Sequence, residues 1–98
     1  MIGIDLTTIS RFKNKSETFV KTILSEQELV EYNSAENKEL FLASRWAIKE
    51  ALFKCDNSLM PFSKINIKKE DRKYKFDNYS ISTSSEGDLY IAIAKKEN

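Results

Sequence analysis

The sequence has no histidine among its 98 residues, and it has only two glycines, one cysteine and one proline. Without histidine, catalysis by a Ser-His or Cys-His arrangement is excluded, and so are most zinc and copper sites. Two glycines are too few for a phosphate-binding P-loop or a dinucleotide-binding fingerprint. One cysteine excludes an internal disulfide, which fits a reducing cytoplasm. Any enzyme chemistry must therefore use carboxylates, lysine, arginine and a hard metal ion.

Positive and negative charges nearly balance, since 16 Lys and Arg residues accompany 15 Asp and Glu residues, for a net charge of +1. This balance gives no general reason to expect binding to nucleic acid or to an anionic membrane. No apolar run approaches membrane-spanning length, and the first residues, M-I-G-I-D-L, lack the features of a signal peptide. We expect one cytoplasmic domain, residues 1–98, with a modest core that oligomerisation often supports.

Hydrophobic periodicity divides the chain into an N-terminal strand, a helical middle and a C-terminal meander. Ser25 and Glu28 form a capping box that opens a helix over residues 26–32. The longest helical pattern covers residues 38–54, and Pro61 makes its continuation unfavourable. The other predicted elements are a strand over 1–6, a helical turn over 9–12 opened by Thr7 or Thr8, a short helix after Ser16, and strands around 64–68, 74–76, 79–83 and 89–94. This order predicts an α+β fold that ends in an antiparallel meander.

The long predicted helix has two very different faces. One face is an ordinary apolar core stripe. The opposite face carries cations, a carboxylate and large aromatics, namely Arg45, Trp46, Lys49, Glu50, Phe53 and Lys54. We interpret the second face as a binding surface for a partly flat, anionic ligand, with Glu50 placed to hold a cation.

Asp5 and Glu50 are the candidate metal ligands. Each has a simpler explanation alone, because Asp5 can cap the next helical turn and Glu50 can pair with Lys54 at i+4. Together they match the demands of Mg²⁺, which binds one or two carboxylates and completes its shell with waters and substrate phosphates. Arg45, Lys49 and Lys54 share the face of Glu50 and can hold such phosphates, although plain solvation explains Lys49 equally well.

Two segments resemble the motifs of a known family. G-I-D-L-T-T-I-S-R (Gly3 to Arg11) is similar to an N-terminal motif, and F-L-A-S-R-W-A-I-K-E-A-L-F-K (Phe41 to Lys54) is similar to a second, helical motif. The family is the holo-[acyl-carrier-protein] synthases, short 4'-phosphopantetheinyl transferases. Segments 23–29 and 79–86 also resemble the family, so the resemblance covers nearly the whole chain.

The resemblance implies transfer of 4'-phosphopantetheine from coenzyme A to a serine of apo-acyl carrier protein, with release of adenosine 3',5'-bisphosphate, in service of fatty acid biosynthesis. It implies that Asp5 and Glu50 bind Mg²⁺, that Arg45 and Lys54 contact coenzyme A phosphates, and that Arg11 receives the acidic carrier protein. Asp5, Glu50 and Lys54 are therefore the expected catalytic residues. The resemblance also implies a homotrimer with sites between subunits. Glu50 and a metal-bound water remain alternatives for the base.

The sequence departs from the family at the coenzyme A site. Family members commonly carry S-x-S-H where this chain has Ser82-Thr83-Ser84-Ser85, so we expect Ser84 and Ser85 to substitute in binding the nucleotide. The lost histidine supports an alternative, an inactive carrier-protein or nucleotide-binding module with the same fold. A nucleic-acid binder that uses the basic segment 11–15 is a third interpretation, and the balanced charge disfavours it.

Overall fold

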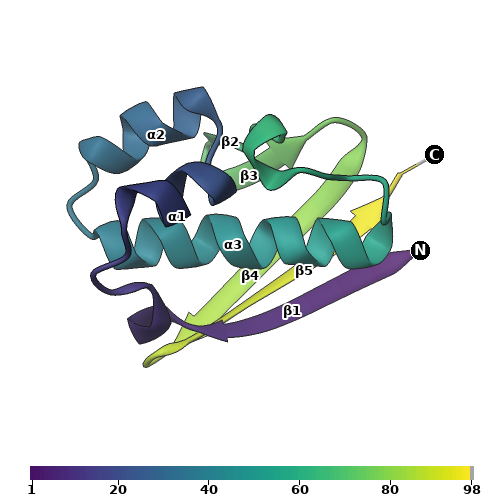
Figure 1. The fold of residues 1–98 in the computed structure, drawn as a ribbon. Coiled ribbons are helices and arrows are strands. Elements are labelled where there is room, and N and C mark those ends of the chain that lie inside the picture. Colours follow the sequence, from purple (N-terminus) through teal and green to yellow (C-terminus); the bar gives the residue numbers. More distant parts are fainter. Residues whose placement is uncertain (98) are drawn as a thin grey trace.

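The computed structural model describes residues 1–97 as one five-stranded antiparallel sheet with its helices gathered on one face (Figure 1). The strand order across the sheet is β1-β5-β4-β3-β2. The strands are β1 (Ile2–Thr8), β2 (Lys68–Glu70), β3 (Lys73–Phe76), β4 (Tyr79–Glu86) and β5 (Leu89–Lys96). The helices are η1 (Ile9–Phe12), α1 (Glu17–Ile23), α2 (Glu26–Asn33), α3 (Lys38–Cys55) and η2 (Phe62–Lys64), with η1 and η2 of the 3-10 type. The predicted α+β class and the order strand, helices, meander are confirmed.

Helix α3 lies across the inner face of the sheet and is the centre of the core (Figure 1). Its first turn is capped by the Asn37 side chain, which accepts a hydrogen bond from the Leu40 backbone N–H. Ten of its 18 residues are buried, because the sheet covers one side and η1, α1 and α2 cover another. Because α3 is enclosed on two sides, only a narrow stripe of it is exposed. Arg45 and Lys49, which the sequence pattern places on the ligand-binding face, are buried.

Strand β1 shows the alternation of a strand with one buried face. Gly3, Asp5 and Thr7 point toward α3, whereas Ile2, Ile4 and Leu6 point to the other side of the sheet and are exposed. Asp5 therefore lies in the middle of a strand. The strand predicted over residues 1–6 is present but extends two residues further, because pairing with β5 continues to Thr8.

The short helices begin where the sequence predicts. Ser16 caps α1 by accepting a hydrogen bond from the Phe19 N–H, and Ser25 and Glu28 form the predicted capping box of α2. The predicted strand at 64–68 is wrong, since Phe62–Lys64 form η2 and β2 begins only at Lys68. Ile65 and Ile67 are buried as alternation requires, but the Ile67 N–H donates to the Glu28 carboxylate and not to a neighbouring strand.

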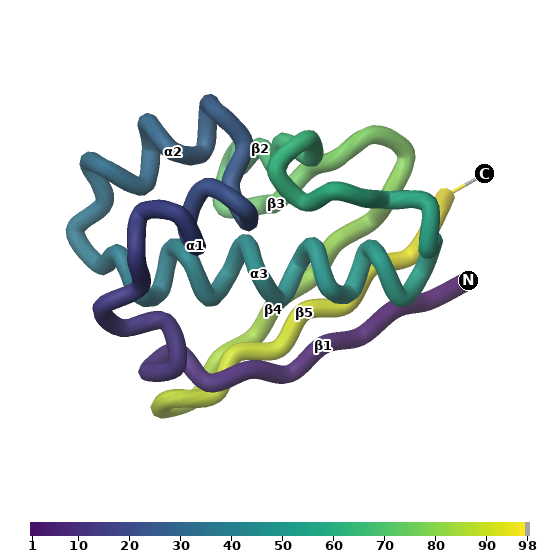
Figure 2. Tube along the Cα trace, viewed as in Figure 1, coloured from purple at the N-terminus to yellow at the C-terminus, as the bar shows by residue number. Residues whose placement is uncertain are grey.

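The two ends of the described chain lie beside each other, because β1 and β5 are antiparallel neighbours and Ile2 is opposite Lys95 (Figure 2). Across the sheet, Asp5 of β1 lies opposite Ala92 of β5, and Ala92 lies opposite Thr83 of β4. Within residues 1–97, none of the helices combines the length and the apolar character that crossing a membrane requires.

Candidate active site

Gly3 allows β1 to contact α3 directly. A Cβ at this position would lie 1.8 Å from the Ala51 carbonyl oxygen and 2.7 Å from the Cys55 backbone nitrogen. Only glycine permits this approach of the two backbones. Since Asp5 is the next inward residue of the strand, its carboxylate is brought against the same helix.

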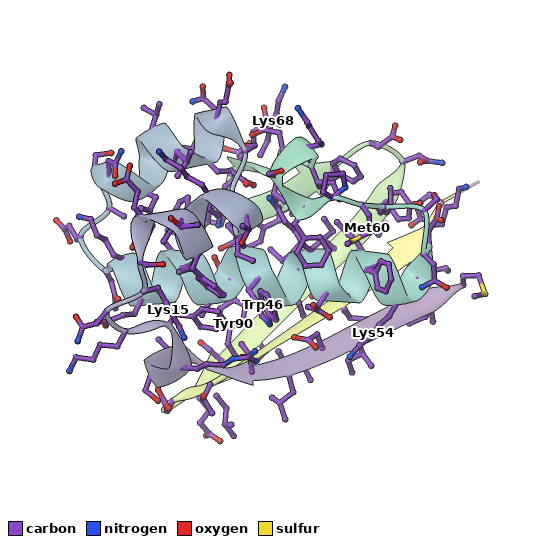
Figure 3. All side chains as sticks on the ribbon, viewed as in Figure 1. Lys15, Trp46, Lys54, Met60, Lys68 and Tyr90 are labelled. Carbon is purple, nitrogen blue, oxygen red and sulfur yellow. The ribbon has the colours of Figure 1, made fainter. Side chains whose placement is uncertain are left out.

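Asp5 and Lys54 form an ion pair between β1 and α3. The Lys54 Nζ lies 3.1 Å from Asp5 Oδ1 and 3.0 Å from the Ile4 carbonyl oxygen, and Figure 3 shows Lys54 at this edge of the helix. The Asp5 side chain is only 12% exposed. Its second oxygen, Oδ2, is buried and has no hydrogen-bond partner among residues 1–97. Because a buried carboxylate oxygen without a partner is costly, this oxygen is the available ligand of the site.

Glu50 lies close enough to Asp5 for the two carboxylates to interact electrostatically. Burial raises the pKa of the Glu50 carboxyl most, the Asp5 carboxylate raises it further, and Lys54 and Arg11 partly oppose the change. The net pKa shift is upward, so the ionised form of Glu50 is less favourable here than in water, and a bound cation would oppose that shift. The structure thus brings Asp5, Glu50, Lys54 and Arg11 together.

Arg11 reaches this group from η1. Its guanidinium carbon lies 4.9 Å from the centroid of the Trp46 ring and 5.4 Å from that of the Phe12 ring. Trp46 lies on the side of α3 that faces the viewer in Figure 3, and it packs against Phe12 with ring centroids 5.8 Å apart. The arrangement holds an exposed cation at the rim of the site, over an aromatic surface.

Lys49 lies elsewhere, although it is adjacent to Glu50 in the sequence. Its side chain is fully buried, and its Nζ lies 2.5 Å from Glu28 Oε1, 2.7 Å from the Ile23 carbonyl oxygen and 2.9 Å from the Phe62 carbonyl oxygen. These three contacts use every N–H of the ammonium group. Burial is the main cause that lowers the pKa of Lys49, and Glu28 opposes it. The expectation that Lys49 lies on an exposed surface with Glu50 is wrong, because the buried Glu28 carboxylate draws its ammonium inward.

Arg45 is also buried and separate from Asp5 and Glu50. Its guanidinium carbon lies 4.1 Å from the Phe41 ring centroid and 5.0 Å from the Tyr74 ring centroid, and its Nη1 donates to Ser44 Oγ over 2.9 Å. With Phe41, Ser44 and Tyr74 it lines a hollow of about 260 Å³ to which Lys69 contributes a second cation. This hollow is cationic and aromatic, and it opens between α3 and the β2–β3 hairpin.

Ser84 and Ser85 lie on opposite faces of the sheet. Ser84 is opposite Ile91, which is opposite Leu6, so this row belongs to the open face. Ser85 is opposite Tyr90 and shares the inner face. Both line a hollow of about 190 Å³ with Leu6, Leu89 and Ile91. The structure therefore does not gather the two serines with Asp5 and Glu50.

Three features of the site do not follow from the sequence patterns. Thr7 is buried on the inner face of β1, and its Oγ1 has no partner in the described part of the chain. Glu28 forms a buried ion pair with Lys49, whereas the sequence indicates only that Glu28 caps a helix. Within residues 1–97 no cluster of three or more His, Cys, Asp or Glu side chains surrounds a common point. A metal bound by Asp5 and Glu50 would thus complete its shell with other ligands, as Mg²⁺ commonly does.

The profile of the 4'-phosphopantetheinyl transferase superfamily matches residues 1–94, and the chain belongs to that family. The holo-[acyl-carrier-protein] synthase of Mycoplasma mobile is 58% identical over 98 residues, which cover 99% of this chain and 90% of the relative. The family and such relatives indicate that the chain is a phosphopantetheinyl transferase.

Solved structures show the same fold at lower identity. The holo-[acyl-carrier-protein] synthase of Neisseria meningitidis has a TM-score of 0.82 at 24% identity, with 99% of this chain and 97% of that chain covered. The synthase of Helicobacter pylori, solved in complex with coenzyme A, has a TM-score of 0.78 at 24% identity, with 99% of this chain and all of that chain covered (100%). The family resemblance and the fold predicted from the sequence are both confirmed.

Proposed function

We propose that the chain transfers 4'-phosphopantetheine from coenzyme A to a serine of apo-acyl carrier protein in a Mg²⁺-dependent reaction, releasing adenosine 3',5'-bisphosphate. The observation that carries the proposal is the meeting of Asp5 and Glu50, two carboxylates from distant segments, beside Lys54 and Arg11. Phosphoryl transfer depends mainly on positioning and on neutralisation of phosphate charge. A compact group of two acids and two cations suits both needs.

The residues fit a magnesium ion. Asp5 Oδ2 is a buried oxygen without a partner among the described residues, and the pKa of Glu50 is raised by burial first and by the nearby Asp5 carboxylate second. Asp5 and Glu50 would hold the ion, which supplies charge neutralisation for the pyrophosphate oxygens when bound. Lys54, half exposed at the edge of the site, would add positive charge toward the same oxygens.

Arg11 would receive the carrier protein at the rim of the site. It is exposed on η1 and lies over Trp46, so it can pair with an acidic partner while its stem stays packed on the ring. The serine of the carrier would approach past this rim toward Glu50. The raised pKa of Glu50 is a shift in the direction that suits a proton acceptor near neutral pH.

Coenzyme A would extend from this group toward two other surfaces of the molecule. Arg45 and Lys69 line a separate aromatic hollow, and Ser84 and Ser85 line another at the open face. These surfaces are not continuous with Asp5 and Glu50 in the contacts of one chain, so we propose that a second copy completes the coenzyme A site. Lys49 has no free N–H for a phosphate, and we assign it a structural role.

The proposed assembly is a cytoplasmic homotrimer built on the open face of the sheet. The exposed apolar side chains gather there, namely Ile2 (60% exposed), Ile4 (52%), Leu6 (60%), Leu89 (49%) and Ile93 (39%). A contiguous apolar face of this kind marks an interaction surface. Its continuity with the hollow that Ser84 and Ser85 line favours another copy of the chain as the occupant.

The test is a transfer assay with apo-acyl carrier protein, coenzyme A and Mg²⁺, read by the mass of the carrier and by release of adenosine 3',5'-bisphosphate. We expect a mass gain on the carrier serine that disappears with Asp5→Asn or with chelation of the metal. Asp77→Asn is the matched control, because Asp77 is exposed in the β3–β4 turn. Binding of coenzyme A without any mass gain in the wild-type protein would support the inactive-module alternative and refute the proposal.

A further inference from the structure

The tip of the β4–β5 hairpin is hydrogen-bonded to the start of η1. Asp88 accepts from the Ser10 backbone N–H through Oδ1 at 2.9 Å and from the Ser10 hydroxyl through Oδ2 at 2.5 Å. Its carbonyl oxygen accepts from the Ile9 N–H at 2.8 Å. Three hydrogen bonds thus join residues that are almost the whole chain apart in sequence.

These bonds replace the capping that η1 lacks. Thr8, the residue before η1, makes no side-chain capping bond, so the predicted role of Thr7 or Thr8 as a cap is wrong. A 3-10 turn of four residues has almost no intrinsic stability. Its free N–H groups need acceptors from outside, and Asp88 supplies them.

The far end of η1 is anchored differently. Phe12 is 2% exposed and packs in the core against Trp46 and Phe19. Arg11 lies between the hydrogen-bonded start and the buried end, with its charge over Trp46 and near Glu50. Loss of the Asp88 carboxylate would remove the two bonds to Ser10 and leave the backbone bond from Ile9 and the buried Phe12 in place. The protein should therefore stay folded, while the start of the turn that carries Arg11 becomes less constrained.

We propose that Asp88, acting with Ser10, is a positioning residue that holds Arg11 over Trp46 at the rim of the active site. The kinetic consequence rests on the proposed function, because it uses the role of Arg11 toward the carrier protein. The structural consequence does not, because it concerns only where the guanidinium lies. The hairpin thereby acts on the partner-binding surface through Arg11.

The first test uses Trp46, which is the only tryptophan of the chain. Arg11→Ala removes the cation from the indole ring and defines the full change in Trp46 emission. We expect Asp88→Ala to shift the emission in the same direction, and Asp88→Asn to restore most of the wild-type signal, because an amide oxygen still accepts from the Ser10 N–H. Glu86→Ala is the matched control, since it removes a carboxylate from the same hairpin and leaves all three bonds intact. Wild-type emission from Asp88→Ala would overturn the proposal.

The second test measures steady-state transfer. We expect Asp88→Ala to raise KM for the carrier protein about fivefold, equivalent to ~1 kcal/mol, with KM for coenzyme A unchanged. In the Arg11→Ala background the same substitution should have no further effect. Additive effects, or equal losses in Asp88→Ala and Asp88→Asn, would refute the capping mechanism. No transfer by the wild-type protein would refute the proposed function instead, and the fluorescence result would still decide the position of Arg11.

Discussion

Substitution of Gly3 by alanine tests whether the contact between β1 and α3 creates the metal site. The new Cβ would lie 1.8 Å from the Ala51 carbonyl oxygen, whereas ordinary contact begins at 3.4 Å, so strand and helix must separate by about 1.6 Å. The neighbouring atoms are backbone and cannot rotate away. Overpacking costs up to about 3 kcal/mol where side chains can adjust, so we expect a loss of at least ~3 kcal/mol. For a domain of this size that is a fall of roughly 12–24 °C in Tm.

The separation should also weaken metal binding, because Asp5 moves with β1 and Glu50 stays with α3. At 100 times its Kd, Mg²⁺ should stabilise the wild-type protein by about 2.7 kcal/mol. Thermal unfolding followed by circular dichroism, with and without Mg²⁺, measures both effects. We expect Gly3→Ala to lose most of the Mg²⁺-dependent rise in Tm.

Gly87→Ala is the control, because the chain has only these two glycines. Gly87 has a φ of +57°, and a Cβ at this position would meet no atom within 4 Å. Alanine there should cost about 1–2 kcal/mol of backbone strain and leave the Mg²⁺ response unchanged. A Gly3→Ala protein with wild-type Tm and a wild-type Mg²⁺ response would refute the proposed role of this contact.

Three further substitutions test other parts of the structure. Glu50→Gln should raise the Tm of the metal-free protein at pH 7 and abolish its response to Mg²⁺. Because the Glu50 pKa is raised, protonated Glu50 contributes to folding stability below pH 4.5, and this contribution is lost as the pH rises through the shifted pKa. The Tm values of the two proteins should therefore converge in acid, and a constant Tm difference from pH 4 to 8 would contradict this. Lys49→Met should lower the free energy of unfolding by about 3–5 kcal/mol, because it leaves the Glu28 carboxylate buried without its main cation. Chemical denaturation measures this loss, and a loss below 1 kcal/mol would argue against a structural role for Lys49. Leu6→Glu should lower the mass of the oligomer measured by light scattering, because it places a charge on the open face of the sheet. Val30→Glu, at a similarly exposed site on α2, should leave the mass unchanged. An unchanged mass in both variants would contradict the proposed interface.

Much of the fold follows from local signals in the sequence. The Ser25–Glu28 capping box predicts the start of α2, and the 3.6-residue period predicts α3 to within one residue of its end. The pairing of Asp5 with Glu50 is predictable only from the family resemblance of the two motifs and from the demands of Mg²⁺, because neither carboxylate is specific alone and no local pattern places the strand against the helix.

The direction of the lysine side chains cannot be predicted in this way. Lys49 and Lys54 have the same chemistry and occupy the same helix, yet Lys49 is fully buried and Lys54 is half exposed. The difference depends on Glu28, whose buried carboxylate requires a cation in the core, and no local pattern connects residues 28 and 49. The predicted strand at residues 64–68 is absent for a related reason. The Ile67 N–H donates to the Glu28 carboxylate, so it cannot donate to a neighbouring strand.

The pairing of β1 with β5 makes the chain suitable for reconnection. Since Ile2 is opposite Lys95, a short linker can join the two strands as one more hairpin without displacing Asp5. New ends can then be opened at the exposed turn of Asp71 and Arg72, which lies at the far edge of the sheet. A circularly permuted chain of this kind should retain its carboxylate pair, because every contact that builds the site is independent of where the backbone begins.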